Sequence, residues 1–210
     1  MKIKLYLKYL LQVLSGGKIL YFPPGRPLRT VVLTFDDGPH PVYTKAILEV
    51  LRQYQLKAVF FLTGSNVKKY PELVKLIYND GHQIGNHAFH HQRPGAIGWR
   101  KYLTEVKDTQ NYIEKTIGRT LPLYFRPPFG AVSLFSLASV LLEGFTVVMW
   151  SYDSGDSYIT DPTKLLAYAG QMTKTKTAIL LMHDDYEQTV FVLPKLLQQI
   201  ADQGWKAVLF

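Results

Sequence analysis

Val31-Val32-Leu33-Thr34-Phe35-Asp36-Asp37-Gly38-Pro39-His40 joins an apolar run to two adjacent carboxylates. Its β-branched and aromatic first half predicts a buried strand, and the acids follow where that strand ends. Neighbouring carboxylates repel each other unless a metal ion or an arginine neutralises them. Because side chains alternate along a strand, Asp36 and Asp37 can point to different partners. The same residues also suit an acidic turn closed by Gly-Pro, so both interpretations stay open at this point.

Similar apolar runs recur along the chain and alternate with segments of helical periodicity. Further strands are predicted at residues 58–62, 83–85, 123–126, 145–150, 178–182 and 205–210. Helices are predicted around residues 47–54, 71–80, 102–117, 133–143, 162–172 and 190–202. This alternation predicts an α/β fold with about seven parallel strands and right-handed crossovers.

Residues with reactive side chains follow many different predicted strands: the first, third, fourth, fifth and sixth. In a (β/α) barrel the carboxyl ends of all strands meet at one mouth, whereas an open sheet offers a crevice mainly at one switch point. No glycine-rich phosphate loop opens any predicted helix. A closed or nearly closed barrel is therefore favoured over an open doubly wound sheet.

The chain has the size and composition of one folded domain, with 210 residues that are 47% hydrophobic and 19% charged. We expect this domain over residues 30–210, preceded by a basic, apolar lead-in and a Gly- and Pro-rich linker over residues 1–29. Cysteine is absent, which excludes disulfides, thiolate metal sites and cysteine nucleophiles. A metal would have to be bound by His, Asp, Glu or backbone oxygen.

The N-terminal segment has apolar residues at helical spacing: Leu7, Leu10, Leu11 and Leu14. Lys8 and Gln12 interrupt the apolar run, so the segment is a poor signal peptide, and it is too short to span a bilayer. We expect an amphipathic helix that packs on the domain, with membrane contact as the less favoured alternative.

The net charge of +8 favours anionic partners. The basic residues form no long block and aromatics do not interleave with them, so no nucleic-acid partner is predicted. A solvated basic surface is the simpler interpretation.

Three of the six histidines fall within Asn86-His87-Ala88-Phe89-His90-His91, after the third predicted strand. On a helical turn, the spacing of His87 and His91 places both imidazoles on one face, close enough to share one cation. A polar, His-rich loop is the alternative. Together with the Asp pair, the two histidines indicate a metal site.

Three other strand ends carry charged or titratable side chains. Arg126 ends an apolar strand, so its charge needs an anionic partner such as Asp36 unless it turns out to solvent. Asp153 and Asp156 follow the fifth strand, and His183 closes a wholly apolar one. With acids beside it, His183 becomes a plausible proton donor near neutral pH.

These five segments, in this order, resemble the motifs of the carbohydrate esterase family 4 polysaccharide deacetylases, the NodB-like domain. The resemblance covers about residues 30–210. The matching segments are Thr34-Phe35-Asp36-Asp37-Gly38-Pro39, His87-x-x-x-His91, Arg126-Pro127-Pro128-Phe129, Asp153-x-x-Asp156 and Leu181-Met182-His183. It implies a distorted, incomplete (β/α) barrel.

The resemblance also implies a function: a hydrolase acting on carbon–nitrogen bonds other than peptide bonds, which removes acetyl from N-acetylated amino sugars in peptidoglycan, chitin-type glycans or exopolysaccharide. Asp37, His87 and His91 would bind one divalent metal ion, with zinc expected. Asp36 would be the general base and His183 the general acid, while Asp156 or Asp153 would tune His183 and Arg126 would position Asp36. Residues expected to contact substrate are Pro128, Phe129, Tyr152 and Leu181.

Two positions depart from the family pattern. Ala88 replaces a Ser or Thr that steadies the loop between the metal-binding histidines, and Ser157 replaces a Trp that lines the cleft. Neither change removes a catalytic group. The alternatives are a catalytically weak carbohydrate-binding protein of the same fold, an O-acetyl esterase acting on xylan-type glycans, and an amidase acting on cyclic amides.

The expected partner is an N-acetylated glycan. Weak association with a membrane or the cell envelope is left open, as is the oligomeric state. The substrate class favours the cell envelope or the extracellular space, although the N-terminus is a poor signal peptide.

Overall fold

The computed structural model describes residues 2–25 and 27–210, with backbone alone for residues 2–5. All nine strands of its single sheet pair in parallel, in the order β1-β6-β5-β4-β3-β2-β8-β7, with β9 beside β2. Their bounds are β1 Ile19–Leu20, β2 Thr30–Asp36, β3 Val59–Leu62, β4 Gln83–Asn86, β5 Tyr124–Phe125, β6 Thr146–Val148, β7 Tyr152–Asp153, β8 Thr177–His183 and β9 Lys206–Ala207.

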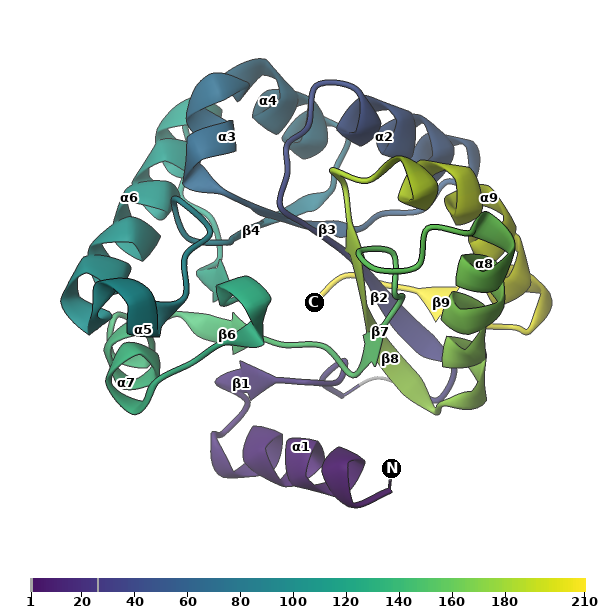
Figure 1. The fold of residues 1–210 in the computed structure, drawn as a ribbon, viewed down its shortest axis with the longest axis horizontal. Helices are drawn as coiled ribbons and strands as arrows, with labels where there is room; N and C mark the ends of the chain where they lie inside the picture. Colours follow the sequence, from purple (N-terminus) through teal and green to yellow (C-terminus); the bar gives the residue numbers. More distant parts are fainter. Residues whose placement is uncertain (1, 26) are drawn as a thin grey trace.

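The sheet curls into a half-barrel with helices around its outside (Figure 1). Strands β1 and β7 are the two edges of the sheet, and within the described residues they do not pair with each other, so the barrel is incomplete. The predicted distorted (β/α) barrel of parallel strands is confirmed. Two strands were not predicted, β1 and β7, because β1 lies in a Gly- and Pro-rich segment and β7 in a polar one that lacks the apolar run of the other strands. Residues 15–29, expected to be irregular, contribute β1 through its pairing with β6.

The expected helices form close to their predicted places: α2 Tyr43–Gln53, α4 Pro71–Asn79, α6 Trp99–Ile117, α7 Leu134–Leu142, α8 Pro162–Gly170 and α9 Glu187–Asp202. The N-terminal helix is α1 Lys2–Leu14. Two short helices were not predicted, α3 Gly64–Lys69 and α5 Pro94–Ile97, and short 3-10 turns follow at η1 Pro128–Gly130 and η2 Gln171–Lys174. Pro71 begins α4 at the first helical position, where a missing N–H costs nothing.

Every residue of β2 is buried, because the strand has helices on one face and the barrel interior on the other. Val31, Leu33 and Phe35 pack into the layer between sheet and helices. The alternate residue Val32 packs inside the barrel with Phe61 and Ile179. Thr34 and Asp36 share this interior face because side chains alternate along a strand.

The C-terminal residues fill the barrel interior near the amino ends of the strands. Val208, Leu209 and Phe210 pack against the interior cluster, and the Phe210 N–H donates to Oε1 of Gln83 at 3.1 Å. Figure 1 shows the C-terminus inside the ring of strands. The interior is thus a packed core, and the polar side chains collect above it, at the carboxyl ends of the strands.

Candidate active site

The carboxyl ends of β2, β4, β5 and β8 bring the predicted polar residues together. Asp36 ends β2 and lies opposite His183, which ends β8. Asn86 ends β4 opposite Phe125 in β5, so His87 and Arg126 are the next residues on neighbouring strands. Asp156, after β7, bonds to His183, so all five segments predicted from the sequence contribute to one site.

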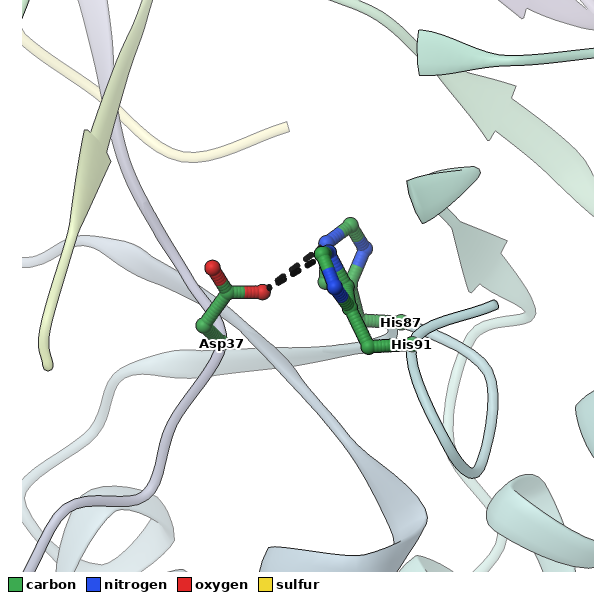
Figure 2. Close-up of side chains that lie close together, drawn as sticks. All are labelled: Asp37, His87 and His91. Atoms are coloured by element: carbon green, nitrogen blue, oxygen red, sulfur yellow. Dashed lines mark ion pairs between the residues drawn. The ribbon is translucent and has the colours of Figure 1, made fainter. Parts of the chain in front are cut away.

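Asp37, His87 and His91 form the centre of this site (Figure 2). Oδ1 of Asp37 lies 3.3 Å from Nε2 of His87 and 3.1 Å from Nε2 of His91. The three potential ligand atoms all lie within 4.8 Å of one another. Oδ1 of Asp37 is buried and accepts no hydrogen bond from the protein. One carboxylate oxygen and two imidazole nitrogens suit zinc and similar divalent ions, and three protein ligands leave coordination positions open.

The two histidines reach this point from an irregular loop, so the predicted helical turn is wrong. Ala88 and His91 have φ of 59° and 53°, outside the helical region. The loop is held by backbone bonds from Gly64 N to Ala88 O at 2.9 Å and from Ser65 N to Phe89 O at 3.0 Å. Tertiary hydrogen bonds, which a local pattern does not reveal, therefore bring the rings together.

Asn86 and Glu105 steady the same loop. Oδ1 of Asn86 accepts from Ala88 N at 2.9 Å, while its Nδ2 donates to Val106 O at 2.7 Å. Glu105 accepts from the backbone N of His90 at 3.2 Å and pairs with the His90 ring at 3.0 Å. The missing hydroxyl at Ala88 therefore leaves the loop with other polar supports.

The backbone of Arg126 orients His87. Nδ1 of His87 lies 2.7 Å from the Arg126 carbonyl oxygen, and a carbonyl can only accept, so Nδ1 carries the proton. In the neutral ring this leaves the lone pair of Nε2 facing Asp37, as a metal ligand requires. Burial opposes the charged ring, but Asp36 and Asp37 outweigh it and raise the pKa of His87. The site thus favours positive charge.

Charge around Asp37 keeps its carboxylate ionised. Burial alone would raise the pKa of Asp37, but the close approach of the His87 ring and the charges of His87 and His91 lower that pKa to about 2. An ionised carboxylate is the form that binds a cation.

The side chain of Arg126 is fully buried beneath Asp36. Its Nη1 donates to Oδ1 of Asp36 at 2.7 Å and to Oγ1 of Thr34 at 2.7 Å. Its remaining bonds go to the carbonyls of Val148 and Met149, and its guanidinium stacks on Phe61 at 4.1 Å from the ring centroid. The expected pairing of Arg126 with Asp36 is therefore present, and it fixes one oxygen of this carboxylate.

His183 pairs with Asp156, whereas the Asp153 carboxylate bonds to the backbone of its own loop. Nδ1 of His183 lies 2.8 Å from Oδ1 of Asp156, while Oδ1 of Asp153 accepts from Gly155 N at 2.8 Å. Burial opposes protonation of His183, but Asp156 with the charges of Asp36 and Asp37 raises its pKa to about 10. The imidazole is therefore protonated at neutral pH, with Nδ1 committed to Asp156 and Nε2 free to act as a donor.

The four residues expected to contact substrate differ in how far their side chains are exposed to solvent. Phe129 is exposed, and its ring centroid lies 4.3 Å from that of His91. Tyr152 is half-buried and donates to Tyr168 O at 2.8 Å, whereas Pro128 and Leu181 are buried. Phe129 is the one of these four that presents an apolar face to solvent beside a metal-site histidine.

Several residues around the site had no role assigned from the sequence. Thr189 donates to Asp156 at 2.7 Å, and Gln188 donates to the Asp156 carbonyl at 2.6 Å. Asp184 is fully buried and accepts from Thr44, and burial, followed by nearby carboxylates, raises its pKa to about 8. A Cβ at Gly38 would overlap the Asp184 carboxylate, which explains the glycine next to Asp37. The acids after His183 were the only sequence signal for Asp184.

A sequence model described as polysaccharide deacetylase matches residues 25–148. A peptidoglycan-N-acetylglucosamine deacetylase from Bacillus cereus is 33% identical over 184 residues, covering 86% of this chain and 85% of the relative.

Two solved structures share the fold. The Bc1960 peptidoglycan N-acetylglucosamine deacetylase superposes with a TM-score of 0.85 at 28% identity, covering 94% of this chain and 92% of the other. A pseudoenzyme of carbohydrate esterase family 4 from Bacillus anthracis superposes with a TM-score of 0.80 at 26% identity, covering 90% of this chain and 66% of the other. Both of these proteins therefore have the fold of this chain.

Proposed function

Because this chain belongs to the polysaccharide deacetylase family, we propose that it removes acetyl from N-acetylglucosamine units of peptidoglycan, with a divalent metal ion bound by Asp37, His87 and His91. Family membership makes it a hydrolase of carbon–nitrogen bonds in acetylated polysaccharides. The finer proposal concerns the metal, which we expect to be zinc, the glycan and the role of each residue.

The observation that carries this proposal is the convergence of three metal-ligand atoms within 4.8 Å of one another, one of them a buried oxygen with no hydrogen bond. On one side lies Asp36, paired with Arg126, and on the other His183, paired with Asp156. A carboxylate held by an arginine and an imidazole whose pKa is raised by a carboxylate, both beside a cation site, suit amide hydrolysis.

A divalent ion held by these residues would polarise the acetyl carbonyl and lower the pKa of an adjacent water. Asp36 accepts a proton from the water that attacks the carbonyl carbon, and Arg126 keeps the Asp36 carboxylate in place. His183 donates the proton on Nε2 to the sugar nitrogen as the carbon–nitrogen bond breaks. The products are acetate, which takes the oxygen of the water, and a free amino sugar, whose nitrogen takes a proton.

Peptidoglycan is proposed as the substrate because the similar enzyme from Bacillus cereus and the Bc1960 deacetylase are both named for it. The net charge of +8 suits an anionic envelope polymer. The substrate class also places the enzyme, in our proposal, at the cell envelope or outside the cell. We further propose that residues 30–210 form the deacetylase domain and residues 1–29 its lead-in. Phe129 would stack on the sugar, while Pro128, Tyr152 and Leu181 would line the acetyl pocket.

Acetate release from purified peptidoglycan tests the proposal, with zinc-loaded enzyme and with Asp36→Asn. We expect release by the native chain and a loss of about 10²–10⁴-fold in the variant. Asp108→Asn, an exposed acid on α6, is the matched control and should keep full activity. Acetylated xylan and a cyclic amide belong in the same panel. Preferential release from xylan would favour the esterase alternative, and no release from any glycan would favour a carbohydrate-binding protein.

A further inference from the structure

Helix α1 is attached to the domain by its polar side chains. Lys8 and Gln12 lie one turn apart, and Nζ of Lys8 donates to Trp150 O at 2.9 Å. Oε1 of Gln12 accepts from the backbone N of Tyr21 and Phe22 at 2.8 and 2.9 Å, and its Nε2 donates to Phe22 O at 3.2 Å. The two residues that interrupt the apolar run are therefore the ones that hold the helix to the barrel.

The apolar side of α1 consequently faces solvent. The predicted stripe is exposed, with relative accessibilities of 51% for Leu7, 38% for Leu10, 48% for Leu11 and 74% for Leu14. Tyr6, Tyr9 and Val13 are exposed as well. An amphipathic helix normally buries its apolar stripe against its own domain, and this one reverses that arrangement. The expected packing of the stripe on the domain is not present, although the helix itself forms as predicted.

Charge indicates what covers this surface. Residues 1–35 contain six Lys or Arg residues and no Asp or Glu, and they carry most of the net charge of +8. A second copy of the same helix would bring like charges together with no acid in the segment to offset them. In the sequence the exposed leucines and tyrosines of this segment are interspersed with lysines. This composition suits the interface of an anionic bilayer, where apolar side chains enter the acyl boundary and cations meet the headgroups.

We infer that α1 is an interfacial helix through which the protein lies on an anionic lipid bilayer. Its 13 residues are far fewer than a span requires, and no helix in the described part of the chain is both long and apolar enough to cross a membrane. The helix would therefore lie in the plane of the surface. Figure 1 shows it outside the ring of the other helices, beside β1, where a flat surface can reach it.

Vesicle flotation with the full chain tests this inference. The lipid would be either phosphatidylcholine alone or equal parts of phosphatidylcholine and phosphatidylglycerol. We expect flotation with the anionic vesicles, weakened by high salt because the charges lie at a solvated surface. Leu10→Glu combined with Leu14→Glu should reduce the bound fraction by about tenfold or more, since each carboxylate must enter the apolar boundary.

The matched control is Val42→Glu combined with Phe191→Glu, which makes the same change at exposed apolar residues away from α1. This double variant should float like the native chain, and both should keep native circular dichroism. Absence of native flotation with anionic vesicles, equal flotation with phosphatidylcholine alone, or equal loss in both variants would overturn the inference. So would a dimer in solution that Leu10→Glu and Leu14→Glu convert to a monomer, because a second copy would then cover the helix. None of these outcomes depends on deacetylation.

Discussion

Asp36 and His183 lie directly opposite each other in the parallel pairing of β2 with β8. Residues paired in this way point to the same face of a sheet, so the register places both side chains at one mouth. Each is then fixed by its own partner, Asp36 by Arg126 at 2.7 Å and His183 by Asp156 at 2.8 Å. The register of two strands thus sets the separation of the proposed base and acid.

Asp156→Asn should move the alkaline limb of the kcat/KM profile to lower pH. His183 donates a proton, so activity falls as pH rises through its pKa, which Asp156 and the nearby carboxylates raise to about 10 against the opposing effect of burial. Removing the Asp156 charge should lower this limb by about one pH unit or more. A bound cation would lower the pKa of His183 in both the native chain and Asp156→Asn, so the difference between the two profiles would remain. Asp153→Asn is the control, and an equal shift there would refute the assignment of Asp156.

Arg126→Met should destabilise the fold by about 3–5 kcal/mol, because it leaves the Asp36 carboxylate buried without its partner. Urea unfolding of the metal-free proteins measures this loss. Arg119→Met, an exposed arginine just after α6, should change stability by less than about 0.5 kcal/mol. A similar loss of unfolding free energy in the two variants would show that the buried pair of Arg126 and Asp36 does not contribute more to stability than an exposed arginine.

Asn86→Ala should weaken zinc binding by about 10–100-fold while leaving all three proposed ligands in place. The side chain of Asn86 anchors the loop between His87 and His91 through Ala88 N and Val106 O. Competition with a chromophoric chelator gives the affinity. Asn79→Ala, at the exposed end of α4, should bind zinc normally. Unchanged affinity in Asn86→Ala would mean that the backbone bonds and Glu105 hold the loop without Asn86.

Asp184→Asn should gain stability relative to the native chain as pH rises from about 4 to about 8. Burial, followed by nearby carboxylates, raises the pKa of Asp184 to about 8, so between these pH values the folded state holds a proton that the unfolded state releases. Native stability therefore falls across this window, and an amide removes the effect. Denaturant unfolding at several pH values, with a chelator present, measures the difference. Asp108→Asn should show no such trend, and a flat difference for Asp184→Asn would contradict the buried, protonated form.

The sequence predicted the parts of the molecule that have strong local patterns. Strand β2 reads as a continuous apolar run because both of its faces are buried, and Asp36 and Asp37 mark its end. Arg126 was paired with Asp36 by charge alone, and the structure contains that pair.

Other features depend on contacts between distant residues. The helical turn expected at His87 and His91 is an irregular loop because bonds to Gly64 and Ser65 outweigh the local spacing. Strand β1 forms in a Gly- and Pro-rich segment through its pairing with β6. The outward orientation of α1 follows from hydrogen bonds of Lys8 and Gln12 to residues of the domain, which helical periodicity alone cannot show.

Metal dependence of acetate release is the most direct test of the central claim. The enzyme would be stripped with a chelator, checked for metal content, and assayed on peptidoglycan before and after addition of zinc, beside Asp37→Ala. We predict that the stripped native chain releases no acetate, that one equivalent of zinc restores release, and that Asp37→Ala responds to neither treatment. Full release by stripped native chain with no measurable metal would contradict a catalytic metal at Asp37, His87 and His91.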